Sequence, residues 1–105
     1  MELAIYWTDF SKNELREIFN YYKEKASLNV ARKLVLEITK ETLKLKKYPK
    51  IGQIEECLSH NSKEYRYLIY SNYKIIYWIN DNNNTVEIFD VFDCRQSPII
   101  LRRTK

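Results

Sequence analysis

In the second half of the sequence, basic residues alternate with tyrosines. We consider this pattern first, because it could bind a ligand. Arg66 lies between Tyr65 and Tyr67, and Lys74 follows Tyr73 in the next β-rich stretch. Cations bind phosphate oxygens, and aromatic rings stack on nucleotide bases or pack against a partner protein. A face that displays both side-chain types therefore predicts a surface for a large ligand.

Other kinds of site lack residues of the required type. The chain has one histidine, His60, and two cysteines, Cys57 and Cys94. These do not make a convincing zinc site, and a catalytic triad that needs histidine has His60 as its one candidate. We therefore expect no metal and no cofactor. The N-terminus does not resemble a secretory signal, and no apolar run approaches the ~20 residues of a membrane helix. We expect a cytoplasmic protein with reduced thiols and no membrane association.

Positive charge gathers in two zones, although the net charge of the chain is only +4. Residues 32–50 hold seven basic and two acidic residues, and residues 95–105 hold four basic residues and no acidic one. The zones predict a polyanion or an acidic protein as partner, but a solvated helix face and a frayed tail fit the charge equally well. The cations that we expect to contact a target are Lys46, Lys47, Lys50, Arg102 and Arg103.

A short strand and a first helix begin the chain. Residues 3–7 alternate between apolar and other side chains well enough for a strand. Either Thr8, or a capping box of Ser11 with Glu14, can cap the helix that follows. We expect this helix to reach about Lys25.

A second helix follows almost at once, so the two helices form an antiparallel hairpin. Ser27 can cap it, and its apolar side chains recur with the helical period of 3.6. This stripe consists of Ala31, Leu34, Val35, Ile38, Thr42 and Leu45. Leu36 and Leu43 lie seven residues apart and off the stripe. They either pack at its margin or form a patch that binds a partner.

Strand-forming residues dominate the sequence after Pro49 and Gly52, which end the second helix. Ser71 and Asn72 form a two-residue hairpin loop between two strong strands. The expected strands are Ile54–Leu58, which is weak, then Glu64–Tyr70, Tyr73–Asn80 and Thr85–Cys94.

The order β-α-α-β-β-β-β predicts a two-layer α+β domain, with the helical hairpin on one face of a mainly antiparallel, twisted sheet. Residues 1–98 would form this single domain, and residues 99–105 a basic tail. Two helices can cover one face only. We therefore expect the other face to display a hollow of arginine and tyrosine, formed by Arg66, Tyr73 and Tyr77.

In this order, the motifs resemble the RelE/ParE superfamily of bacterial type II toxins. They span residues 3–98 and comprise Trp7-Thr8, the helical hairpin, Leu45–Gly52, Glu55, Tyr65–Leu68, Tyr73–Tyr77 and Val91–Pro98. The resemblance implies a sheet packed by two helices and a toxin of a plasmid-stabilisation module. It also implies a small acidic antitoxin encoded next door, for which Leu36 and Leu43 are the candidate binding residues.

Two target classes follow from the resemblance. RelE-like members cut mRNA in the ribosomal A site, and ParE-like members poison DNA gyrase. Metal-independent cleavage needs a base, cations for the phosphorane charge and an acid for the leaving oxygen. Arg66, Arg95 and Glu55 match family positions for the cations and the base. Ion pairing of Arg66 with a nearby glutamate, and solvation of Glu55 at an edge, are the plainer alternatives.

Departures from the nuclease pattern favour the gyrase class. The lysine pair used by nuclease relatives is missing, since Glu55 and Glu56 stand in that region. Asp93 stands near the position of a family histidine, and residues 99–101 are apolar where a tyrosine is expected. We therefore favour a non-enzymatic toxin that inhibits gyrase. A ribosome-dependent mRNA endonuclease is the alternative, and a binding module without toxicity is the second alternative.

Overall fold

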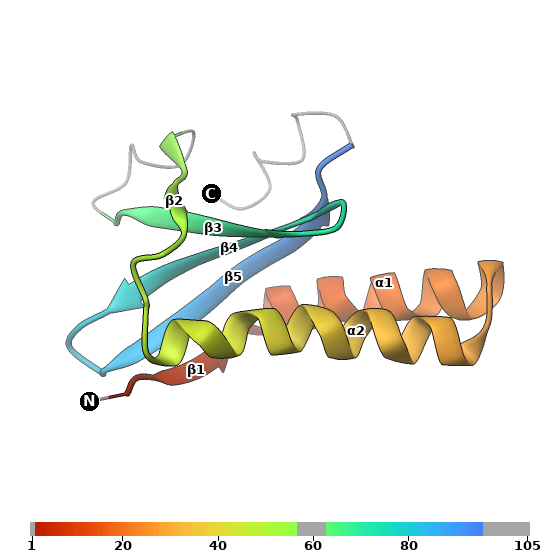
Figure 1. Cartoon of the computed structure of the whole chain (residues 1–105), viewed down its shortest axis with the longest axis horizontal. Helices are drawn as coiled ribbons and strands as arrows, with labels where there is room; N and C mark the ends of the chain where they lie inside the picture. Colours follow the sequence, from red (N-terminus) through yellow and green to blue (C-terminus); the bar gives the residue numbers. More distant parts are fainter. Residues whose placement is uncertain (1, 57–62, 96–105) are drawn as a thin grey trace.

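A computed structural model describes residues 2–56 and 63–95, and these residues form two α-helices, one short 3-10 helix and five strands. The helices α1 and α2 lie side by side against one face of a twisted sheet, with β2 at the far edge from β1 (Figure 1). The elements in chain order are β1 (Ala4–Trp7), α1 (Asp9–Lys25), α2 (Leu28–Leu43), the short 3-10 helix η1 (Lys44–Lys46), β2 (Gln53–Ile54), β3 (Tyr65–Tyr70), β4 (Tyr73–Asn80) and β5 (Thr85–Asp93).

The sheet has the strand order β1-β5-β4-β3-β2. The first strand of the chain pairs in parallel with the last one, Ala4 opposite Thr85, and the other three pairings are antiparallel. The predicted α+β class, the element order and the mainly antiparallel sheet are thus confirmed.

Hydroxyl side chains begin both helices. Thr8 Oγ1 accepts a hydrogen bond from the amide of Ser11 at 3.1 Å, and Ser27 Oγ accepts one from the amide of Val30 at 3.1 Å. Each bond satisfies an amide that has no partner within the helix. Ser11 does not cap α1, because its buried hydroxyl donates to the carbonyl oxygen of Thr8 at 2.9 Å. Thr8 was therefore the correct alternative, and the predicted end at Lys25 is confirmed.

The main core lies between the helices and the sheet. Ile38 of α2 and Leu45 of η1 are fully buried against the middle of β4 and β5. The predicted stripe of α2 supplies this side of the core, with Ala31 and Thr42 also fully buried. The buried members of the cluster are Ile38, Leu45, Tyr73, Ile75, Tyr77, Val86, Ile88 and Val91.

The face of the sheet without helices carries a second cluster. Tyr65, Ile76 and Phe92 are 4%, 0% and 7% exposed, and Trp78 and Phe89 pack against them. A cation lies on this cluster, because Lys63 Nζ is 4.4 Å from the centroid of the Trp78 ring. This face combines aromatic rings with cations, as expected, but its central side chains are buried.

Two details differ from the predicted strands, and the predicted hairpin loop agrees. The strand β2 has two residues rather than the five of Ile54–Leu58, although the amide of Glu55 still donates to Tyr65 at 2.8 Å. The register of β4 and β5 shifts between Ile76 and Tyr77, a bulge that no sequence pattern indicated. Ser71 begins the β3–β4 turn with a φ of 54°, consistent with the predicted two-residue loop. Residues 57 and 58 lie outside the described part of the chain.

Candidate functional site

Arg66 of β3 holds a neighbouring segment of its own chain. It lies on the face that the helices cover, since it is directly opposite Tyr77 of the main core. Its Nη1 donates to the carbonyl oxygens of Lys50 at 3.2 Å and Gly52 at 2.9 Å, and its Nη2 pairs with Glu64 at 3.2 Å. Only 14% of the Arg66 side chain is exposed. The guanidinium therefore fixes the segment between η1 and β2 and presents little surface to a ligand.

Tyr77 holds the same segment through its hydroxyl. The hydroxyl donates to the carbonyl oxygen of Pro49 at 2.6 Å and accepts from the amide of Gly52 at 3.0 Å. A Cβ atom at position 52 would lie 2.7 Å from the carbonyl oxygen of Tyr67, so this position has no room for a side chain. Burial raises the pKa of Tyr77, which keeps the hydroxyl protonated and able to donate.

Tyr73 and Tyr77, which were expected to contact a target, both lie in the main core. Tyr73 is 5% exposed and Tyr77 is 0% exposed. Their rings cannot stack on a ligand while the core is intact, and the expected hollow of Arg66 with these tyrosines is absent from the described residues. Strand alternation had divided the side chains correctly between two faces. It did not indicate which face the helices cover, because both faces are rich in apolar groups.

Glu55 lies just beyond β2 and is 5% exposed. Its carboxylate forms an ion pair with Lys74, whose Nζ also lies 4.1 Å from the centroid of the Tyr67 ring. Lys74 is opposite Phe92 of the second cluster, so this pair lies on the face without helices. The alternative that Glu55 is a solvated edge residue is therefore wrong.

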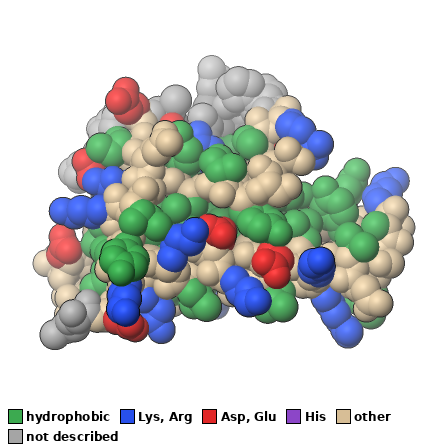
Figure 2. Space-filling model, viewed as in Figure 1, with side chains coloured by type: hydrophobic (Ala, Val, Ile, Leu, Met, Phe, Trp, Pro, Cys, Tyr) green, Lys and Arg blue, Asp and Glu red, His purple; other side chains and the backbone are tan. Residues whose placement is uncertain are grey.

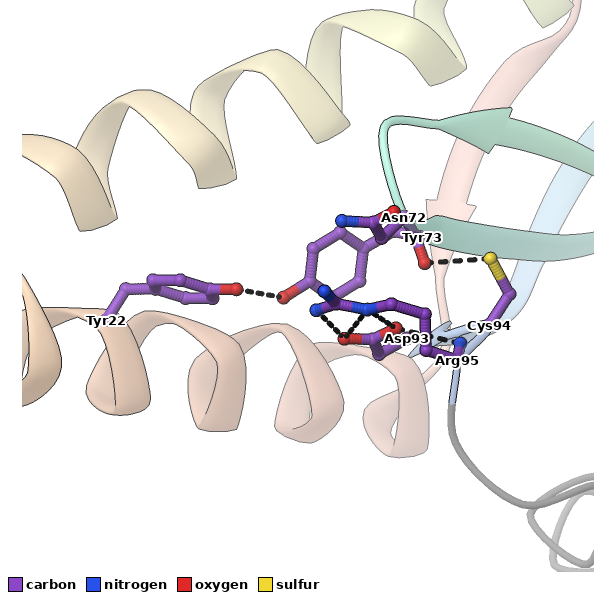
Figure 3. A network of polar contacts seen from close by, with 6 residues as sticks. All are labelled: Tyr22, Asn72, Tyr73, Asp93, Cys94 and Arg95. Carbon is purple, nitrogen blue, oxygen red and sulfur yellow. Dashed lines mark hydrogen bonds and ion pairs between the residues drawn. The ribbon is translucent and has the colours of Figure 1, made fainter.

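Arg95 follows β5 and pairs with Asp93 (Figure 3). Its Nη2 donates to Asp93 Oδ2 at 2.6 Å, and its Nε lies 3.0 and 3.2 Å from the two carboxylate oxygens. In contrast to Arg66, 63% of the Arg95 side chain is exposed. Hydrogen bonding from this guanidinium lowers the pKa of Asp93, so the carboxylate remains ionised well below neutral pH.

Further polar contacts join the β3–β4 turn to the end of β5 (Figure 3). The amide and thiol of Cys94 both donate to the carbonyl oxygen of Asn72, at 2.7 and 2.9 Å. The hydroxyls of Tyr73 and Tyr22 lie 3.3 Å apart and connect the turn to α1. Burial raises the pKa of Tyr73, so its hydroxyl is neutral at physiological pH. This network ties three elements together at one end of the sheet.

The three residues predicted as catalytic do not converge. Arg66 lies at the level of Tyr77 along β4, whereas Arg95 follows the β5 residue that is opposite Tyr73. Four residues of a strand span about 13 Å. The carboxylate of Glu55 lies on the opposite face from Arg66. Cleavage of a phosphodiester needs base, cations and acid within hydrogen-bond reach of one phosphate.

An apolar groove runs between α1 and α2 beside the end of β1. It has a volume of about 460 Å³ and is lined by Trp7, Lys12, Leu15, Arg16, Phe19, Val35 and Thr39. No sequence pattern indicated this groove. Phe19 has the apolar spacing of its neighbours in α1, and only the packing of the two helices shows that it is absent from the main core cluster.

The outward side of α2 displays leucines and cations. Leu36 is 55% exposed and Leu43 is 51% exposed. Figure 2 shows Lys and Arg side chains spread along the surface that α2 forms in Figure 1. Among the predicted target contacts, Lys47 and Lys50 are exposed and Lys46 is half-buried. Arg102 and Arg103 lie outside the described residues.

Two further findings concern the described residues alone. Between residues 2–56 and 63–95, no three or more His, Cys, Asp or Glu side chains come together to hold a metal ion. No helix in the same two ranges has the length and apolar character to span a membrane.

Comparison with known families assigns the chain to a class. The family described as ParE toxin of type II toxin-antitoxin system, parDE, matches residues 5–98. Because the match covers most of the sequence, the chain belongs to this toxin family, and the resemblance to the RelE/ParE superfamily is confirmed. No curated protein sequence matches significantly.

Solved structures share the fold at low sequence identity. The chromosomal ParDE TA system from P. aeruginosa matches with a TM-score of 0.71 and 15% identity, over 88% of this chain and 96% of that one. The toxin–antitoxin complex RelBE2 from Mycobacterium tuberculosis matches with a TM-score of 0.65 and 15% identity, over 89% and 99%. A mutant of E. coli toxin RelE in the free state matches with a TM-score of 0.55 and 17% identity, over 98% of both chains.

Proposed function

We propose that this toxin arrests growth by binding an essential target rather than by cutting RNA, and that the target is DNA gyrase. One observation carries the proposal: the guanidinium of Arg66, the best cation for a scissile phosphate, is bound to the carbonyl oxygens of Lys50 and Gly52. While the Arg66 guanidinium donates to these carbonyl oxygens, it cannot bind a phosphate. The segment of residues 50–52 would first have to detach from it. The membership in the ParE family supports gyrase as the target.

The other candidate groups support the same conclusion. Arg95 is exposed, but its guanidinium donates to the Asp93 carboxylate. Glu55 is held by Lys74 and lies on the other face of the sheet. A nuclease would need these groups to meet at one phosphate, and about 13 Å of strand separates the two arginines.

We further propose that an acidic, amphipathic segment of a cognate antitoxin covers the helical hairpin. Leu36 and Leu43 each lie one turn from Thr39, which lines the apolar groove, so groove and leucines form one continuous surface. Lys12 and Arg16 of the groove would pair with acidic side chains of such a segment. The names of two structural relatives describe toxin–antitoxin assemblies.

The decisive experiment measures DNA supercoiling by purified gyrase as the toxin is added. We expect supercoiling to fall with rising toxin concentration and to recover when the antitoxin encoded next door is added first. Full supercoiling activity at saturating toxin would refute gyrase as the target. Toxin unfolded by heat is the control for nonspecific inhibition.

The exposed guanidinium of Arg95 favours mRNA cleavage as the second candidate function. Primer extension on mRNA, after the toxin is produced without its antitoxin, would show new 5′ ends within reading frames if the toxin is a nuclease. We expect none. Unimpaired growth in the same culture would instead favour a binding module without toxicity.

A further inference from the structure

Basic residues recur on the outward surface of α2 and η1 after the first turn of α2. Between positions 32 and 47, every exposed residue is either a leucine or a cation. The leucines are Leu36 and Leu43, and the cations are Arg32, Lys33, Lys40, Lys44 and Lys47. The two acidic residues of this stretch, Glu37 and Glu41, are half-buried.

Four of these cations form a row, which we call the lysine row: Lys33, Lys40, Lys44 and Lys47. Their spacing of seven, four and three residues keeps them on one side of a helix. Lys44 is engaged with Glu41, 2.5 Å from its carboxylate. The other three have no ion-pair partner within residues 2–56 and 63–95.

The same concentration of charge does not occur on α1. Its exposed positions include the acidic residues Asp9, Glu17 and Glu24 and four basic residues, which nearly cancel. Both helices are exposed to solvent on their outward sides. Solubility alone therefore does not explain why α2 carries an excess of positive charge and α1 does not. A one-signed surface beside a mixed one indicates a ligand of opposite charge.

We propose that the lysine row binds the phosphate backbone of a nucleic-acid duplex, independently of base sequence. The row spans about 21 Å, from Lys33 to Lys47, at the rise of an α-helix. A duplex carries one phosphate per ~1.7 Å of axis, so a straight row of this length meets several phosphates at once. Leu36 and Leu43 adjoin the row, three or four residues from its lysines, on the edge of the row that is nearer the groove.

This property does not depend on gyrase inhibition. A toxin could bind duplexes through α2 and act on another target, or inhibit gyrase without free duplex binding. The supercoiling assay and the binding assay below can therefore fail separately.

The test measures anisotropy of a short fluorescent DNA duplex of mixed sequence, titrated with purified toxin at several salt concentrations. The variant K33Q/K40Q/K47Q removes three unpaired charges of the row. We expect its affinity to fall about tenfold or more, and the slope of log affinity against log salt to fall by about 2–3. The matched control K12Q/K23Q/K25Q removes three charges from α1, and we expect less than about a threefold loss.

Two controls separate loss of charge from loss of folding. The variant K33R/K40R/K47R conserves charge and should bind like the unchanged toxin, and thermal unfolding should be alike for all forms. Equal losses in the two glutamine variants would overturn the proposal. It would also be overturned if vesicles with anionic phosphatidylglycerol bound more tightly than the duplex and depended on the same lysines.

Discussion

Arg66 and Arg95 differ in environment, although both were predicted as cations for the same phosphate. The guanidinium of Arg66 is mostly buried and donates to backbone carbonyl oxygens on a neighbouring segment. The guanidinium of Arg95 is mostly exposed and pairs with Asp93, two residues earlier. The first arginine connects distant parts of the chain, and the second is a local surface pair. Arg66 therefore stabilises the fold, whereas Arg95 remains accessible at the surface.

The largest effect expected at the Arg66 end comes from Gly52→Ala. The new methyl group would meet the Tyr67 carbonyl oxygen at 2.7 Å and displace the Tyr77 hydroxyl. Overpacking of this kind, together with lost hydrogen bonds, should lower the free energy of unfolding by about 3 kcal/mol or more. Urea unfolding followed by circular dichroism measures the loss. A loss below about 1 kcal/mol would show that the segment has more freedom than this contact allows.

Replacement of Arg66 by alanine should have the next largest effect. It removes two charge-assisted hydrogen bonds and leaves the Gly52 carbonyl without its partner, at a cost of about 2–3 kcal/mol. Lysine at the same position carries the charge but not the two-pronged geometry, and should recover only part of the loss. Urea unfolding of the two variants side by side tests this. Equal stability of Arg66→Ala and the unchanged protein would contradict the fixing role.

Tyr77→Phe should cost somewhat less, about 1–2 kcal/mol, because the ring continues to fill the core. The substitution leaves the buried amide of Gly52 without its acceptor and the Pro49 carbonyl without its donor. Hydrogen exchange of the Gly52 amide, followed by NMR, should accelerate. Tyr67→Phe is a suitable control, since the Tyr67 hydroxyl bonds to exposed Gln53.

The smallest effect on stability is expected for Arg95→Ala, whose side chain is largely in solvent. Its clearest consequence is on Asp93, whose pKa should rise toward its ordinary value when the guanidinium is removed. A carboxyl with a lowered pKa in the folded state stabilises the protein above its unfolded pKa, and this stabilisation is lost as the pH falls through the folded pKa. The variant should therefore lose less stability on acidification. An Asp93 pKa that did not move in an NMR titration would contradict this.

The elements were predictable from sequence because their signals are local. Hydroxyl residues at positions 8 and 27 mark helix starts, and β-branched and aromatic runs mark β3, β4 and β5. The apolar period of α2 correctly selected its buried side. These features depend on residues only a few positions apart.

The site was less predictable because it depends on contacts between distant residues. Alternation placed Arg66 with Leu68 on one face, but Tyr67 and Ile69 on the other face are equally apolar, so nothing local indicated which face the helices cover. The bonds from Arg66 to residues 50 and 52 join positions that are 16 and 14 residues apart, respectively. The bulge between Ile76 and Tyr77 likewise depends on a partner strand. The tyrosine assignments failed for this reason.

The parallel pairing of β1 with β5 has a consequence for synthesis of the toxin. The Thr8 hydroxyl donates to the carbonyl oxygen of Ile88, 80 positions later, and Ala4–Trp7 pair with residues 85–88. Contacts between such distant positions close late, because a long loop must be ordered first. A nascent polypeptide still lacking residue 88 has no partner for its opening strand. The first strand therefore acquires its partner in the sheet only after residues 85–88 have been synthesised.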